Sequence, residues 1–178
     1  MTENIKSQLE NAAENLSIEF QRVLINEMST EEGLVPVLMD IGSDPARYIN
    51  IFSDEIIRLG AAYYNGQGEE QDLNEAIKWY KKAADLGHGV ARWNLETIAR
   101  QGHAGAQYNV GLLYHEGIGI KQNNVTAYAW WDNAATNGYQ DAKEKKTIIT
   151  ERITPAQIVK AEELVLEMTK NHPKLLNK

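Results

Sequence analysis

The chain has 178 residues, of which 43% are hydrophobic and 24% charged, so it can bury a core and is too apolar for wholesale disorder. It contains no cysteine, which excludes disulfide bonds, thiolate catalysis and cysteine-ligated zinc. Its net charge of −7 disfavours general nucleic-acid binding, because an acidic protein repels phosphate backbones, and favours a basic partner.

Residues 1–53 hold nine acidic and three basic side chains and are expected to form an N-terminal helical cap. An amphipathic helix is indicated by apolar residues that recur at steps of three and four, namely Ile5, Leu9, Ala12, Leu16, Phe20 and Leu24. A second helix can start at Ser29, and a third, short one at Asp44-Pro45. We expect these helices to cover the end of the domain, while the alternative is that this acidic segment binds the partner itself.

The N-terminus carries acidic residues and has no apolar core stretch, so it is not predicted to be a secretory signal. The longest uncharged run, residues 101–115, is too short and too polar to cross a bilayer. These features predict a cytoplasmic location without a membrane span.

Residues 54–65 are predicted to form the first helix of a helical hairpin. Gly60 lies inside this helix, where the missing side chain lets a neighbouring helix approach closely. The turn Gly66-Gln67-Gly68 supplies backbone angles that other residues resist, so it should end the helix.

Asp72 is expected to cap the second helix of the hairpin, with Glu75 three residues later completing a capping box. Gly87 should end this helix as a C-terminal cap. The predicted packing face recurs at helical spacing and consists of Ala76, Trp79, Tyr80, Ala83 and Ala84.

The pattern of residues 59–87 recurs in residues 110–138 at a constant offset of 51. The matched pairs include Gly60 with Gly111, Tyr63 with Tyr114, Gly66 with Gly117, Gly68 with Gly119, Ala76 with Ala127, Trp79 with Trp130, Tyr80 with Trp131, and Gly87 with Gly138. Such dense self-similarity indicates a repeat architecture, in which Asn123 or Asn124 caps the corresponding later helix.

A shorter echo relates residues 87–95 to residues 102–110 at an offset of 15. The two offsets leave 36 residues for a full unit, so the middle unit, 88–102, is truncated and holds about one helix where two would be regular. The sequence leaves open whether this unit folds as one helix or as two short ones.

Gly117 and Gly119 form a Gly-x-Gly motif that two kinds of structure can explain. A dinucleotide-binding turn needs a preceding strand and a third glycine, but Gln122 occupies that third position. Because the whole unit is repeated, we interpret these glycines as helix termini rather than as a phosphate cradle.

The repeated glycines, tyrosines and alanine pairs of residues 54–87 and 103–138 resemble the Sel-one-like repeat family, which is related to the tetratricopeptide repeats. The resemblance covers residues 54–142 and implies an all-α fold, a short α/α superhelical solenoid with N-terminal capping helices and a C-terminal capping helix. Its members are mostly scaffolds, adaptors or inhibitors that hold other proteins. Glu69 departs from the pattern, which has valine there, whereas the later unit has Ile120.

Residues 143–178 are expected to close the array with capping helices. Thr154 is a predicted N-cap, Pro155 takes the first helical position, and Gln157 lies three residues beyond Thr154 to complete a capping box. The basic side chains of this segment alternate with acidic ones, which favours a solvated helix face over a nucleic-acid patch.

The sequence indicates neither catalytic residues, nor a cofactor, nor a metal site. His88 and His103 follow helix-ending glycines at equivalent positions, so they are interpreted as loop or cap residues rather than as metal ligands. All serines lie at or before Ser53, and no Gly-x-Ser-x-Gly motif is present. The tryptophans at repeat packing positions, Trp79, Trp130 and Trp131, are assigned to the core.

Partner binding is expected at exposed positions on the first helix of each unit. The candidate contact residues are Arg58, Arg92, Glu96, Asn109 and Leu113, with Trp93 as a candidate aromatic anchor. The alternative is that they are ordinary surface residues, and for Trp93 the core interpretation is favoured.

The sequence as a whole favours a non-catalytic module that binds another protein. The first hypothesis is a cytoplasmic bacterial inhibitor, such as an immunity protein that neutralises a basic toxin or effector, because the chain is small and acidic. The alternatives are a regulatory or assembly adaptor and, more remotely, a hydrolase built on the solenoid. The partner and the oligomeric state stay open.

Overall fold

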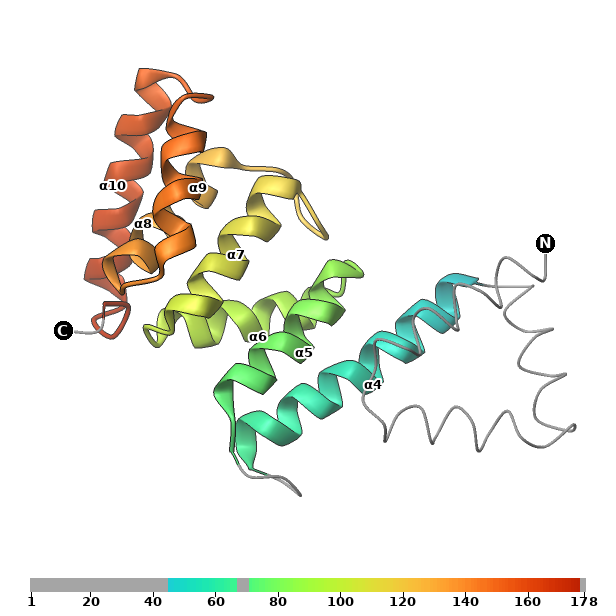
Figure 1. The fold of residues 1–178 in the computed structure, drawn as a ribbon. Helices are drawn as coiled ribbons and strands as arrows, with labels where there is room; N and C mark the ends of the chain where they lie inside the picture. The colour runs from blue at the N-terminus through green and yellow to red at the C-terminus, as the bar shows by residue number, and fades with distance from the viewer. Residues whose placement is uncertain (1–44, 67–70, 177–178) are drawn as a thin grey trace, which may run out of the picture. The chain divides into compact units, whose positions relative to one another are not determined.

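The computed structural model describes residues 45–66 and 71–176, and the elements within them are all α-helices (Figure 1). In chain order the helices are α4 (Pro45–Asn65), α5 (Leu73–Asp85), α6 (Gly89–Arg100), α7 (Ala104–Glu116), α8 (Asn124–Thr136), α9 (Gln140–Thr150) and α10 (Pro155–Asn171). The chain divides into two compact units, Met1–Ile51 and Phe52–Lys178, and the second contains α5 to α10 and the part of α4 after Ile51. The capping helices predicted within residues 1–44 lie outside the described residues.

Helix α4 corrects one predicted boundary. The sequence predicts a short helix from Asp44-Pro45 and a separate one over residues 54–65, but α4 runs continuously through both. Nothing between Pro45 and Gly60 breaks a helix, and extending an existing helix adds one hydrogen bond for each residue that is fixed. Ser53 is buried in the middle of α4 rather than placed at a helix end.

The sequence repeat is also a structural repeat, because in both full units an aromatic ring of the second helix packs against the equivalent glycine of the first helix. A β-carbon at Gly60 in α4 would lie 2.9 Å from the ring of Tyr80 in α5. A β-carbon at Gly111 in α7 would lie 2.4 Å from Nε1 of Trp131 in α8. Both distances are too short for any real side chain, so glycine is required at each position. This confirms the predicted α/α repeats and the predicted close approach at Gly60.

The second helix of each full repeat begins with the same set of hydrogen bonds. Asp72 accepts from the backbone amides of residues 74 and 75, and Asn123 accepts from those of residues 125 and 126, so Asn123 is the cap that the sequence left undecided. The backbone N–H of Asp72 donates to Tyr63 O at 3.0 Å, and that of Asn123 donates to Tyr114 O at 2.8 Å.

The predicted capping box at Asp72 is therefore only half correct. Its backbone N–H is bonded to the preceding helix, and the Glu75 carboxylate pairs with Lys78 instead of reaching back. The C-terminal prediction for this helix is confirmed. Gly87 has φ +86° and donates to Ala84 O at 2.8 Å, as expected of a glycine just beyond a helix end.

The middle unit folds as the single helix α6, which settles the alternative left open by the sequence. Helix α6 packs against both α5 and α7, and α5 also contacts α7. The chain thus passes from α6 directly to α7, without a second helix of the truncated unit.

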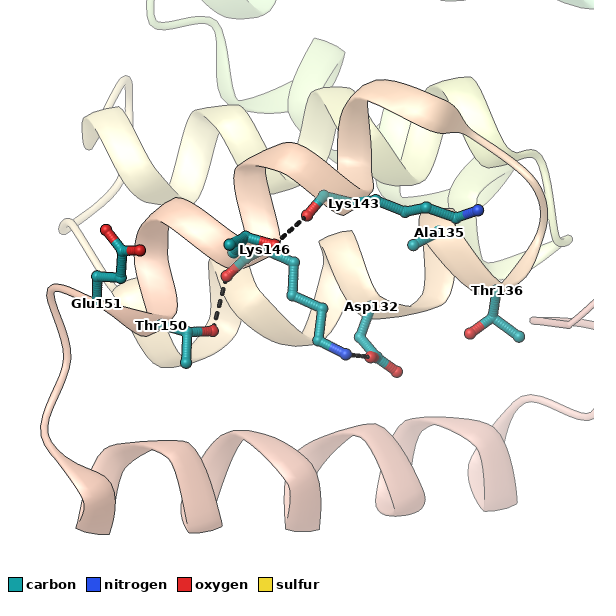
Figure 2. A pocket seen from close by; sticks show the side chains of 8 residues that line it. Asp132, Ala135, Thr136, Lys143, Lys146, Thr150 and Glu151 are labelled. Atoms are coloured by element: carbon teal, nitrogen blue, oxygen red, sulfur yellow. Dashed lines mark hydrogen bonds and ion pairs between the residues drawn. The ribbon is translucent and has the colours of Figure 1, made fainter.

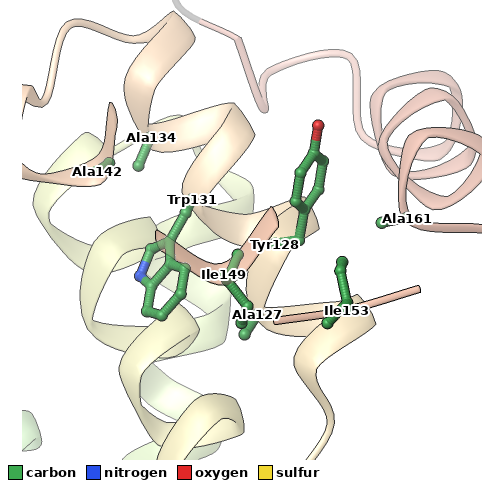
Figure 3. Close-up of a cluster of buried hydrophobic side chains, with 8 residues drawn as sticks. All are labelled: Ala127, Tyr128, Trp131, Ala134, Ala142, Ile149, Ile153 and Ala161. Carbon is green, nitrogen blue, oxygen red and sulfur yellow. The ribbon is translucent and has the colours of Figure 1, made fainter. Parts of the chain in front are cut away.

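The C-terminal helices close the array around one apolar cluster (Figure 3). The cluster joins α8, α9 and α10 and consists of Ala127, Tyr128, Trp131, Ala134, Ala142, Ile149, Ile153 and Ala161. Helix α10 begins with the predicted capping box: Thr154 Oγ1 accepts from Gln157 N at 3.3 Å, and Gln157 Oε1 accepts from Thr154 N at 2.9 Å. The core assignment of the three repeat tryptophans is confirmed, since Trp79, Trp130 and Trp131 are all buried.

Candidate functional site: the surface of helix α6

The Gly117–Gly119 turn is not built to hold a phosphate. The segment before it is helix α7, and Gly117 adopts the left-handed conformation that ends this helix, with φ +74°. The backbone N–H groups of Gly117 and Ile118 both donate to Leu113 O, at 2.9 and 3.2 Å. These two amides are consequently hydrogen-bonded within the C-terminus of α7, which supports the interpretation that the motif ends a helix.

The structure places the six predicted contact residues in three different environments. Leu113 and Glu96 are buried, with exposed fractions of 1% and 7%, so the expectation that they lie at exposed positions is wrong. Arg58 is exposed, while Arg92 and Asn109 are half-buried. Trp93 is 60% exposed, which overturns its interpretation as a core residue.

Glu96 is the centre of a charged cluster between α6 and α7. Its Oε1 accepts from Arg92 Nη1 at 3.1 Å and from the Tyr114 hydroxyl at 3.2 Å, and its Oε2 accepts from Arg100 Nη2 at 2.9 Å. Burial raises the pKa of Tyr114, and the Glu96 charge raises it further. Two guanidinium groups and one hydroxyl thus satisfy a carboxylate that would otherwise be buried at high cost.

The repeat explains why an acidic side chain can be placed there. At the offset of 15 that relates α6 to α7, Glu96 is equivalent to Gly111, and through Gly111 to Gly60. In the full repeats this position must be glycine because an aromatic ring of the second helix lies against it. The truncated unit has no second helix, so the position is free to carry a side chain.

Helix α6 also presents an apolar surface to solvent. Val90 is 53% exposed and Trp93 60%, and the two residues lie three positions apart on one side of α6. Leu86, the C-cap residue of α5, is 46% exposed. We call Val90 and Trp93 the α6 apolar face. The other large exposed hydrophobic residues of the described chain, Val159 and Leu166, lie on α10.

A surface pocket that the sequence did not indicate lies between α8 and α9, with a volume of about 580 Å³ (Figure 2). Its ionisable groups include Lys146 and Asp132, which form an ion pair. Although partial burial lowers the pKa of Lys146, the bond to Asp132 and its charge outweigh burial and raise that pKa. The amine therefore stays protonated near neutral pH and is not poised to act as a base or nucleophile.

The histidines do not assemble a metal site in the described part of the chain. His88 and His103 hold the N-cap positions of α6 and α7, in agreement with their interpretation as cap residues. His88 Nε2 lies 3.1 Å from Asp54 Oδ1 of α4. Among residues 45–66 and 71–176, no group of three or more histidine and carboxylate side chains is arranged to hold a metal ion.

Comparison with known protein families identifies the repeats. The family model of the Sel1 repeat matches residues 56–88 and 104–139. The chain contains two Sel1 repeats. The matches fall on the two full units and leave out all of α6, so the truncated unit separates two regular Sel1 repeats.

Two known proteins illustrate the similarity of this Sel1-repeat chain to others. Chitin synthase regulatory factor 3 of Schizosaccharomyces pombe is 28% identical over 49% of this chain, which spans only 12% of that relative's length. The crystal structure of c5321, a protective antigen of uropathogenic Escherichia coli strains with an SLR fold, is 27% identical. That match covers 69% of this chain and 24% of the antigen, with a TM-score of 0.41.

Sel1 repeats form modules for protein–protein interaction, in which stacked helices present an extended binding surface. Within the described residues, no helix has the length and apolar character needed to cross a bilayer.

Proposed function

We propose that this chain is a non-catalytic module that binds another protein through a surface that includes the α6 apolar face. The observation that carries the proposal is the exposure of Trp93 on a helix between two regular repeats whose own tryptophans are buried. Tryptophan is enriched at the energetic centres of protein interfaces, because one rigid side chain buries a large apolar area.

The finer role that we favour is inhibition of a protein partner, as an immunity protein inhibits a toxin. The net charge of −7 supports this role, since it would steer a basic partner towards the chain. A regulatory adaptor is the second candidate, and it draws support from the similarity to a protein named a regulatory factor. The cytoplasmic location and the bacterial setting stay predictions from the sequence.

The proposed binding function is tested by parallel affinity purification with the wild-type chain and two variants. Trp93→Ala should lower the recovery of a specific partner, and its measured affinity, by about tenfold or more, because truncating an interface anchor costs about 1.4 kcal/mol or more. The matched control is Leu166→Ala, since Leu166 is an exposed apolar residue on α10. Equal recovery with both variants would show that Trp93 is not the anchor, and recovery of no partner by the wild type would contradict the function.

The non-catalytic character is a separate part of the proposal. It is supported by the neutralised pair of Lys146 and Asp132 in the pocket between α8 and α9. A hydrolytic activity of the purified chain that Lys146→Met abolishes would contradict it.

A further inference from the structure

The two full repeats show how the solvent-facing side of a first helix is normally covered. In the later repeat, Tyr139 follows the helix-ending Gly138, and its ring stacks on that of Tyr108 of α7, with centroids 4.8 Å apart and planes at 27°. A β-carbon at Gly105, one turn earlier in α7, would lie 3.7 Å from the Tyr139 ring. The residue after the second helix thus lies over the N-terminal half of the first helix.

The earlier repeat places a residue in the same way. His88 is equivalent to Tyr139 at the offset of 51, and Asp54 is equivalent to Gly105. His88 Nε2 lies 3.1 Å from Asp54 Oδ1, so here too the residue after the glycine contacts the preceding first helix. Two independent copies of the repeat therefore define one position from which the first helix is covered.

The truncated unit lacks this cover. Val90 and Trp93 of α6 are equivalent to Gly105 and Tyr108 of α7 at the offset of 15. A covering residue would follow the second helix of the unit, but the chain passes from α6 directly to α7. Trp93, the equivalent of the half-buried and stacked Tyr108, is consequently 60% exposed.

We infer that the α6 apolar face receives an amphipathic α-helix of the partner protein, whose N-terminal end takes the position that Tyr139, the N-cap residue of α9, takes on α7. An aromatic residue at the N-cap of that helix stacks on Trp93, as Tyr139 at the N-cap of α9 stacks on Tyr108. This inference rests on the proposed function and specifies the kind of segment that is bound. Recognition of an amphipathic helix by an apolar surface is a general mode of protein binding.

The charges beside the face indicate a second feature of the bound helix. Arg92 and Arg100 share the single carboxylate of Glu96, which leaves one positive charge in this cluster. The Arg100 side chain is 37% exposed, and it lies two turns after Trp93 on the same side of α6. A carboxylate on the partner helix would complement this charge, even though the chain as a whole is acidic.

The inference can be tested with the full chain and a displayed library of random 16-residue peptides. Selected peptides should show apolar residues at helical spacing, an aromatic residue near the N-terminus and at least one carboxylate. Their circular dichroism should gain helical signal on binding. Trp93→Ala should weaken their binding at least tenfold, whereas Leu166→Ala should leave it within twofold.

Other outcomes would overturn the inference. The selected peptides could depend on Trp93 and yet show alternating apolar residues and no gain of helical signal. Such peptides bind in an extended form, which would exclude a helix as the occupant and leave the proposed function intact. Selection of no Trp93-dependent peptide would also reject it. Sedimentation of the chain alone tests a second copy as the occupant, and a dimer that Trp93→Ala dissociates would assign the face to self-association instead.

Discussion

The residue type at position 96 is explained by whether a second helix packs against it. The equivalent residues of the full repeats, Gly60 and Gly111, are held as glycine by an aromatic ring against the helix. Glu96 occupies the same position where that ring is missing, and its carboxylate is buried by Arg92, Arg100 and Tyr114. A buried carboxylate of this kind is tolerated because each of its oxygens has a charged donor.

Glu96→Gln should destabilise the domain by about 1–3 kcal/mol, because it leaves two partly buried guanidinium groups without a counter-charge. Urea unfolding followed by circular dichroism measures the change. Glu163→Gln is the control, since Glu163 is exposed on α10 and its substitution should shift the free energy of unfolding by less than about 0.5 kcal/mol. Equal effects of the two substitutions would contradict the structural role of Glu96.

His103 should make the stability depend on pH. Burial lowers the pKa of His103 below its ordinary value of 6.5, and its Nδ1 is buried without a hydrogen-bond partner in the structure. Below this ordinary pKa the unfolded chain binds a proton that the folded chain does not bind, so stability falls as the pH falls from 7 towards the lowered folded pKa.

His103→Gln should therefore flatten the dependence of the unfolding free energy on pH between about 7 and 5. Unfolding curves at each pH measure this slope, and the stability at pH 7.5 is the internal reference. An unchanged slope would show that another group causes the dependence.

At the scale of the elements, each full repeat is a hairpin defined by one glycine–aromatic contact and two capped ends. The contact pairs Gly60 with Tyr80 and Gly111 with Trp131. The backbone N–H of each N-cap donates to the preceding helix, which fixes the angle between the two helices as well as the cap. The hairpin is thus specified by short-range signals, and this is why it recurs in the sequence.

Gly111→Ala should destabilise the domain by about 3 kcal/mol, because its β-carbon would lie 2.4 Å from Trp131, which is fully buried and cannot move aside. Gly89→Ala is the matched control, since a β-carbon there meets nothing within 4 Å. The control should be neutral or stabilising by up to about 1 kcal/mol. Thermal unfolding compares the two, and similar melting temperatures would contradict the packing argument.

At the scale of the compact unit Phe52–Lys178, the C-terminal residues join helices far apart in sequence. Leu175 is fully buried, and its carbonyl accepts from Gln107 Nε2 and Asn137 Nδ2, both at 2.8 Å. The Gln107 amide also donates to Ala99 O at 3.0 Å, so one buried side chain connects α6, α7 and the C-terminal segment.

Truncation after Asn171 should lower the free energy of unfolding by about 2–4 kcal/mol, because it removes a buried leucine and the acceptor of the buried Gln107 amide and the half-buried Asn137 amide. Leu166→Ala serves as the control, since Leu166 is 72% exposed and its loss should change stability by less than about 0.5 kcal/mol. Chemical denaturation of both proteins measures the difference. A truncated chain as stable as the full one would show that Leu175 is dispensable.

The sequence by itself determined the repeats, the N-caps at Asp72 and Thr154 and the core tryptophans, because glycine conformation, capping and helical spacing are local properties that neighbouring residues enforce. It also showed that the middle unit is truncated, whereas only the structure decided that this unit folds as the single helix α6. Only the tertiary structure decided that Leu113 and Glu96 are buried, that Trp93 is exposed and that α4 is continuous. Burial depends on which helix covers a given face, and for Glu96 and Trp93, in the unit that lacks a helix, it does not follow from the pattern of the complete repeats.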